Sequence, residues 1–154
     1  MADKILNFAW GAVNDRVAKV GVGAYLTASA ETPVTTAYTR LLGTFSNVES
    51  EGFEIDGVSG KLMYNPTDEL DRTFNLIFSG NASCPNLNDV ITVGIEVTHD
   101  STPAIVTGTE VSLVCRETNS PYPFSRVFPL SLSVGDLIEI QIKGDASFTA
   151  TMIK

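Results

Sequence analysis

The chain has 154 residues, 44% of them apolar, which is enough for one domain with a core of its own. Its 18 acidic and 10 basic side chains give a net charge of −8, and a field of that sign repels the phosphates of nucleic acids and anionic lipids. The apolar runs fall far short of the ~20 residues that cross a bilayer, and Met1–Lys4 begins no signal-peptide pattern. We therefore expect a soluble protein, made in a cytoplasm, that binds neither nucleic acid nor membrane.

The first 35 residues allow two interpretations. Apolar residues recur at spacings of four and three, as in the seam of a short coiled helix: Leu6, Trp10, Val13, Val17 and Val20. Glycines at 11, 21 and 23 oppose a helix, and Asn14-Asp15 can form the turn of a hairpin between residues 7–13 and 16–25. We favour the hairpin or an extended arm and keep the helix as the alternative.

A connector follows this arm. Thr27–Thr36 is rich in Thr, Ala and Ser, a composition typical of linkers. The sequence therefore predicts an N-terminal arm and connector at residues 1–35 and a globular domain at residues 36–154.

From about residue 38 the sequence consists of short apolar segments between turn residues. Thr73–Ser79, for example, alternates apolar and polar positions with the period of two that a half-buried strand requires. Pro129 interrupts another segment and cannot donate to a strand ladder, so that segment should lie at an edge, at a bulge or across two short strands. The predicted strands are residues 38–45, 52–57, 60–65, 73–79, 88–98, 105–116, 122–132, 137–143 and 147–153. This pattern predicts an all-β fold, an antiparallel sandwich or barrel of about eight to ten strands.

Residues that could carry chemistry are few. His99, the only histidine, lies in a turn-like run and is expected to be a solvated loop residue, while Cys84 and Cys115 are expected to be two buried thiols, with a disulfide as the alternative. We therefore expect no enzymatic activity and no cofactor.

Two acidic clusters resemble possible sites, and we interpret both as solvated loops. Asn65, Asp68, Glu69 and Asp71 could offer oxygens to calcium, but their spacing lacks the calcium-loop signature. Glu49, Glu51 and Glu54 could supply the paired carboxylates of a glycosidase. We expect neither a metal site nor a catalytic site.

The C-terminal half resembles a known family. Leu130–Ile142 has a leucine, a short polar spacer, Gly135-Asp136 and an alternating apolar strand, and this passage resembles the jelly rolls of tumour-necrosis-factor-like and complement-globular-head-like domains. Gly43–Phe45, Gly60–Tyr64, Arg72–Ser79 and Val93–Val97 match the same pattern in order, with His99-Asp100 in place of an Asn-Gly turn. The resemblance covers residues 38–154 and implies an antiparallel jelly-roll sandwich.

The resemblance also implies a homotrimer. It places the last two strands on one sheet that packs about a threefold axis, and their outward rows would form the interface: Leu137, Glu139, Gln141, Phe148, Ala150 and Met152. Phage domains of this kind are similarly rich in Thr, Ser and Asn. This likeness implies a decoration or head-fibre protein on the virion surface, with the major capsid protein as partner.

The aromatic and apolar arm suits attachment to a capsid, because such side chains anchor interfaces, and the alternative is that it covers one end of its own sandwich. The residues expected to make this contact are Phe8, Trp10, Val13, Val17 and Val20. The alternative is a receptor- or glycan-binding tip of a tail fibre, with its site in loops such as Asn81–Asn88 and Arg116–Phe124.

Overall fold

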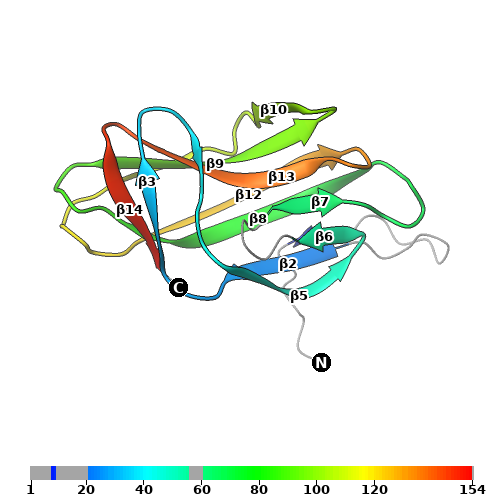
Figure 1. The fold of residues 1–154 in the computed structure, drawn as a ribbon, viewed down its shortest axis with the longest axis horizontal. Coiled ribbons are helices and arrows are strands. Elements are labelled where there is room, and N and C mark those ends of the chain that lie inside the picture. The colour runs from blue at the N-terminus through cyan, green and yellow to red at the C-terminus, as the bar shows by residue number, and fades with distance from the viewer. Residues whose placement is uncertain (1–7, 10–20, 56–60, 154) are drawn as a thin grey trace.

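The computed structural model describes residues 8–9, 21–55 and 61–153, and every regular element among them is a β-strand. The strands form a flattened sandwich (Figure 1). Their bounds are β1 Phe8–Ala9, β2 Gly21–Leu26, β3 Ala30–Val34, β4 Thr39–Arg40, β5 Phe45–Glu51, β6 Phe53–Ile55, β7 Leu62–Tyr64, β8 Arg72–Ser83, β9 Val90–His99, β10 Thr102–Ile105, β11 Val111–Val114, β12 Tyr122–Leu132, β13 Leu137–Gly144 and β14 Phe148–Ile153. The predicted all-β jelly-roll sandwich is confirmed, with additional short strands.

The first sheet has five strands in the order β1-β8-β14-β3, with β12 on the other side of β8. Strand β8 is its centre, because β12 pairs antiparallel with it over eleven residues, from Tyr122↔Ala82 to Leu132↔Arg72. Strand β12 pairs only with β8 among the described strands, so it is an edge strand, as the presence of Pro129 predicted.

The second sheet has seven strands in the order β10-β9-β13-β7-β6. Strand β11 also pairs with β9, and β4 with β13. Strands β2 and β5 form a separate two-stranded ribbon. Because β13 belongs to this sheet and β14 to the first, the last two strands of the chain lie in different layers of the sandwich.

The core lies between the two sheets and follows the predicted period of two. Phe53 and Tyr64 from the second sheet contact Phe74 from the first, with ring centroids 5.1 to 5.4 Å apart. Ile138 and Ile142 of β13 are buried, which confirms that the isoleucine row of this strand faces inward. Alternation on each strand therefore leaves one outward row per strand, and those rows form the two faces of the molecule.

The boundary predicted at residue 35 needs correction. Strand β3, which lies inside the predicted connector, pairs with β14 through five residues, and its Thr32 and Val34 are buried. Pro33 is tolerated because β3 is an edge strand. Strand β2 is likewise paired, with β5 in the separate ribbon, so paired β-structure begins at residue 21 and not at residue 36.

The predicted hairpin of the arm is not found in its described parts. Phe8 and Ala9 pair with Leu76 and Asn75 of β8, and Gly21–Leu26 pairs with β5, so neither segment pairs with the other. Residues 10–20, which contain the predicted turn, lie outside the described residues.

Candidate functional site

The outward rows of β8, β12 and β14 form a surface that we call the uncharged face. Ile77 lies directly opposite Val127 near its middle, and Val127 is 58% exposed. Thr73 and Ser131 are joined across the two strands by a hydroxyl hydrogen bond of 2.8 Å. The face consists of Thr73, Asn75, Ile77, Ser79, Asn81, Pro123, Ser125, Val127, Pro129, Ser131, Thr149, Thr151 and Ile153, none of which carries a charge.

The outward face of the second sheet is charged. Glu96 of β9 lies directly opposite Glu139 of β13, a like-charge pair that is unfavourable unless it is compensated. The Gln141 amide donates to both carboxylates, at 3.1 and 3.3 Å, and Lys61 forms an ion pair with Glu139 at 2.9 Å. A compensated network of this kind stabilises the face within the chain itself.

A second charged cluster lies farther along the same face. Tyr38 donates a hydrogen bond to the Glu110 carboxylate, and Lys143 lies 4.3 Å above the Tyr38 ring. Burial and the nearby carboxylate raise the pKa of Tyr38, so its hydroxyl keeps the proton that it donates. The Lys143 ammonium also lies 3.7 Å from Glu110.

The predicted trimer interface is wrong, because it needs the last two strands to lie in one sheet. Strands β13 and β14 lie in different sheets, so their outward rows point to opposite sides of the sandwich. Leu137, Glu139 and Gln141 lie on the charged face, where Gln141 is already buried within its own chain. The row therefore does not form the apolar surface that the prediction required.

The prediction that Phe148, Ala150 and Met152 of β14 form an outward row is also wrong, for a different reason. Ala150 and Met152 are 0% and 5% exposed and belong to the core, and Phe148 packs against that core. The side chains of this strand that face outward are Thr149, Thr151 and Ile153. Both rows of the strand contain apolar residues, so alternation by itself could not tell which one faces inward.

One end of the sandwich, which we call the histidine end, is formed by two tight turns. Asp100 and Ser101 join β9 to β10, and their positive φ values of 47° and 65° are those of a two-residue hairpin turn. This turn lies one residue beyond the predicted His99-Asp100. The second turn is Ser133–Asp136, where Gly135 has a φ of 90° and where the resemblance placed the Gly-Asp pair.

A hydrogen bond joins these turns. His99 Nδ1 lies 2.7 Å from Asp136 Oδ1, and the other oxygen of this buried carboxylate accepts from the Ser133 amide at 2.8 Å. His99 Nε2 is 3.4 Å from Asp100 Oδ2. The hydrogen bond to Asp136, followed by the charge of Asp100, raises the pKa of His99. The predicted solvated histidine is 58% exposed, but it has a specific partner.

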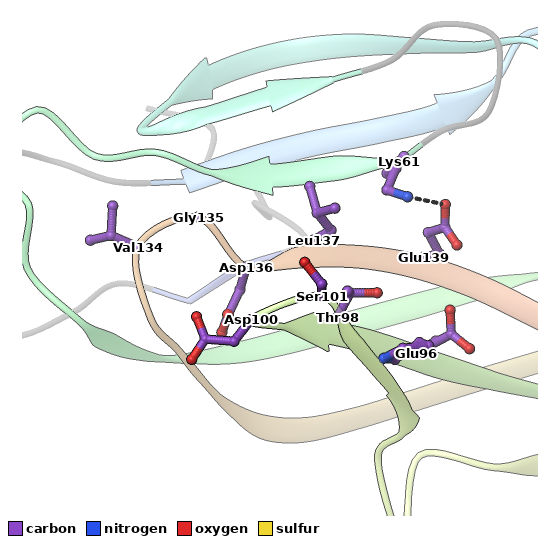
Figure 2. A pocket seen from close by; sticks show the side chains of 11 residues that line it. Lys61, Glu96, Thr98, Asp100, Ser101, Val134, Gly135, Asp136, Leu137 and Glu139 are labelled. Carbon is purple, nitrogen blue, oxygen red and sulfur yellow. Dashed lines mark ion pairs between the residues drawn. The ribbon is translucent and has the colours of Figure 1, made fainter.

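Two shallow hollows flank this end, and both are lined by Asp100 and Asp136. The first, of about 620 Å³, is shown in Figure 2, where the Lys61–Glu139 ion pair borders it on one side and the two turns on the other. The second, of about 770 Å³, opens between β10 and β12 and has a more apolar lining that includes Ile105, Val106 and Leu130. His99 lines the second hollow at the boundary between the two.

The opposite end, which we call the stapled end, consists of the loops at residues 84–89 and 115–121. A disulfide joins Cys84 to Cys115, which corrects the favoured interpretation of two thiols. Asn88 donates to the Cys115 carbonyl at 2.7 Å, and Asn119 donates to the Cys84 carbonyl at 2.8 Å. Both asparagines have positive φ, a conformation that asparagine tolerates better than most residues. The two loops are therefore fixed to each other.

The acidic residues near residue 68 have structural partners. Arg72 binds the Asp68 carboxylate and lowers its pKa, and Asp71 accepts hydrogen bonds from Val134 N at 3.1 Å and Ser133 Oγ at 3.2 Å. Glu54 accepts a hydrogen bond from the Asn65 amide at 2.9 Å. Within residues 8–9, 21–55 and 61–153, no group of three or more metal-ligating side chains is found, and no helix could span a membrane.

The predicted capsid-attachment residues are described only in part. Phe8 lies in β1 at the edge of the first sheet, beside Leu76. Trp10, Val13, Val17 and Val20 lie outside the described residues.

Comparison with known proteins decides the type of fold. A structure of murine APRIL matches with a TM-score of 0.51 and 9% identity over 82% of this chain and 98% of that one. A structure of Eiger TNF from S. frugiperda matches with a TM-score of 0.56 and 8% identity over 86% of this chain and 91% of that one. The fold is a tumour-necrosis-factor-like jelly roll. No family model and no curated protein matches the sequence, so the likeness concerns the fold alone.

Proposed function

We propose that this protein is a non-enzymatic structural module that associates with copies of itself through the uncharged face. The observation that carries the proposal is the outward surface of β8, β12 and β14, where Ile77 and Val127 are surrounded by uncharged polar side chains and prolines. The centres of protein interfaces are depleted of charged residues in the same way.

The charge of the chain supports this choice of face. Each copy carries −8, so two copies repel each other over most of their surfaces. Contact through the second sheet would require desolvation of Glu96, Glu139 and their partners, which is costly. Contact through the uncharged face buries apolar and neutral polar groups instead. We expect three copies, because the sequence resembles trimeric jelly rolls. Contacts between two different patches of the same chain can repeat from copy to copy and close into a ring of three.

Light scattering on purified protein tests the proposal. We expect the mass of a trimer at micromolar concentration and the mass of a monomer for Val127→Glu, which places a charge in the centre of the contact. Val114→Glu is the matched control, because Val114 is an exposed valine of the second sheet, 40% exposed, and should leave the trimer intact. A monomeric parent protein, or a Val127→Glu variant that stays trimeric, would contradict the proposal.

The setting that we propose for this module is the surface of a virus particle, with the major capsid protein as its partner. The sequence resemblance to Thr-, Ser- and Asn-rich phage domains supports this setting. The Cys84–Cys115 disulfide supports it independently, because disulfides persist on virion surfaces and are rare in a reducing cytoplasm.

Attachment is assigned to the N-terminal segment. Since β2 and β3 are both paired with later strands, the deletion that tests attachment removes residues 1–20 and not the longer arm. We expect the shortened protein to fold and to lose co-sedimentation with empty capsids, and Trp10→Ala to weaken it. Undiminished sedimentation of the folded deletion variant would assign attachment to another surface.

A second candidate function, binding of a host receptor or glycan, is favoured by the stapled end. The disulfide and the hydrogen bonds between loops 84–89 and 115–121 fix their shape, which lowers the entropic cost of binding. Binding of the protein to purified host-surface glycans, lost on replacing Asn86 and Asn119 by Ala, would support this candidate. Equal binding by the parent and the variant would exclude these loops.

A further inference from the structure

The two turns of the histidine end come from different parts of the fold. The Asp100-Ser101 turn ends a hairpin of the second sheet, whereas Ser133–Asp136 connects β12 of the first sheet to β13 of the second. The side-chain contact between them is the hydrogen bond from the His99 imidazole to Asp136.

The Ser133–Asp136 turn is fixed without any help from His99. Gly135 donates to the Tyr64 carbonyl at 2.8 Å, and Tyr64 donates to the Asp136 carbonyl at 2.9 Å. The Asp71 carboxylate also accepts a hydrogen bond from the Val134 amide of this turn. The Asp136 carboxylate is therefore a buried anchor in a fixed turn. Strand β9 is itself paired with β13 as far as Thr98↔Leu137, so the part of the hairpin that His99 can hold or release is its tip, the Asp100-Ser101 turn with β10, which pairs only with β9 among the described strands.

Among the described residues, the charged groups that face the imidazole are carboxylates. Asp136 from the β12–β13 turn is the nearest, Asp100 from the β9–β10 turn is next at 3.4 Å, and Asp71 from the segment before β8 acts from farther away. A protonated imidazole is attracted by all three. A neutral imidazole can still donate its Nδ1–H to the Asp136 carboxylate, but it loses the attraction between opposite charges, so the link is weaker.

We propose that His99 is a pH-sensitive latch, which holds the tip of the β9–β10 hairpin against the Ser133–Asp136 turn when the imidazole is protonated and releases the tip when the imidazole is neutral. Both hollows are lined by Asp100 and Asp136, so release of the hairpin changes the walls of both. The hollows are consequently closest to their described shape in mildly acidic solution. The latch does not depend on self-association.

The experiment is simple because the chain has a single histidine. The imidazole of the full protein is titrated by NMR between pH 5 and pH 9, and backbone order parameters of Asp100 and Ser101 are measured across the same range. We expect a titration midpoint above the ordinary value of about 6.5 and order parameters that fall through that midpoint. Asn119, at the stapled end, serves as an internal reference whose order should not change.

Two variants separate the latch from a general effect of pH. His99→Gln removes the titrating group, so the order parameters of the hairpin should no longer depend on pH between 5 and 9. Asp100→Asn removes only the weaker partner, so the midpoint should fall slightly while the coupling to hairpin order remains. A midpoint at or below about 6.5 in the parent protein, or hairpin order that stays constant through the titration, would overturn the proposal.

Discussion

The two ends of the sandwich are each built from a pair of loops joined by one side-chain link, but the links differ in kind. At the stapled end the link is a covalent bond between two cysteines that are 1% and 0% exposed. At the histidine end it is a hydrogen bond between a half-exposed imidazole and a buried carboxylate. Figure 1 shows the stapled loops at the left, where green and yellow segments meet, and the β9–β10 hairpin at the right.

Because one link is a disulfide and the other is a hydrogen bond, the two ends respond to different solution conditions. A disulfide stabilises mainly by restricting the unfolded chain, and it carries no charge at any ordinary pH. The histidine link acts only in the folded state and depends on a proton. One end therefore responds to reducing agents and the other to pH.

The largest effect is expected at the stapled end. Replacing Cys84 and Cys115 together by Ser removes a cross-link between residues 31 positions apart, which should lower the free energy of unfolding by about 3–4 kcal/mol. Urea denaturation followed by circular dichroism measures the change. The loss should be equal at pH 5 and pH 8. A loss that differs between these pH values by more than the error of the measurement would contradict the claim that the stapled end does not respond to pH.

A smaller loss is expected from Asp136→Ala at the other end. The substitution leaves the Ser133 amide and His99 without their acceptor, at a cost of about 1–3 kcal/mol. Asp100→Asn is the control, because asparagine also tolerates the left-handed φ of 47° at this position and the side chain is 91% exposed, so the change in stability should be no more than about 0.5 kcal/mol. If the two variants lost equal stability, Asp136 would not be the anchor of this end.

The backbone of the Ser133–Asp136 turn gives a third measurement. Gly135 has a φ of 90°, and a Cβ added there meets no atom within 4 Å, so Gly135→Ala should cost only the strain of the left-handed conformation, about 1–2 kcal/mol. Gly108, with a φ of 86° and equally open surroundings, provides a matched variant that lies at neither end. Equal losses at the two positions indicate pure backbone strain, and a larger loss at Gly135 indicates damage to the histidine end.

The smallest effect concerns the pH dependence of stability. Because the pKa of His99 is raised in the folded state, its contribution is fully present below the unfolded value of about 6.5 and is lost as pH rises through the higher folded value. The free energy of unfolding of the parent protein should thus exceed that of His99→Gln at pH 5.5 and converge with it at pH 9. If the difference in free energy of unfolding between the parent and His99→Gln grew with pH, the pKa of His99 would be lowered and not raised by folding.

The sequence predicted the features that depend on neighbouring residues. The period of two located the core row of β13, Gly135-Asp136 marked the turn before it, and Pro129 marked an edge strand. These signals are local, since each depends on backbone geometry within a few positions.

The missed features depend on contacts between distant residues. The two cysteines are 31 positions apart and His99 lies 37 positions from Asp136, so no local pattern brings either pair together. The assignment of β13 and β14 to different sheets also depends on long-range pairing. The uncharged face was missed because it combines the outward rows of three strands. The absence of charge at alternate positions of β8 and β12, from Thr73 to Asn81 and from Pro123 to Ser131, was the signal that could have found it.

The free edge of β12 has a consequence for how copies of the protein can meet. An exposed edge strand is a template to which a strand of another molecule can add without limit, and such growth leads to aggregates. Pro123 and Pro129 lie six residues apart on β12, so their nitrogens point the same way, and neither can donate a hydrogen bond. Because the ladder with β8 continues past both, these nitrogens point to the open side. An added strand would find two donors missing there, which favours closed assemblies over fibres.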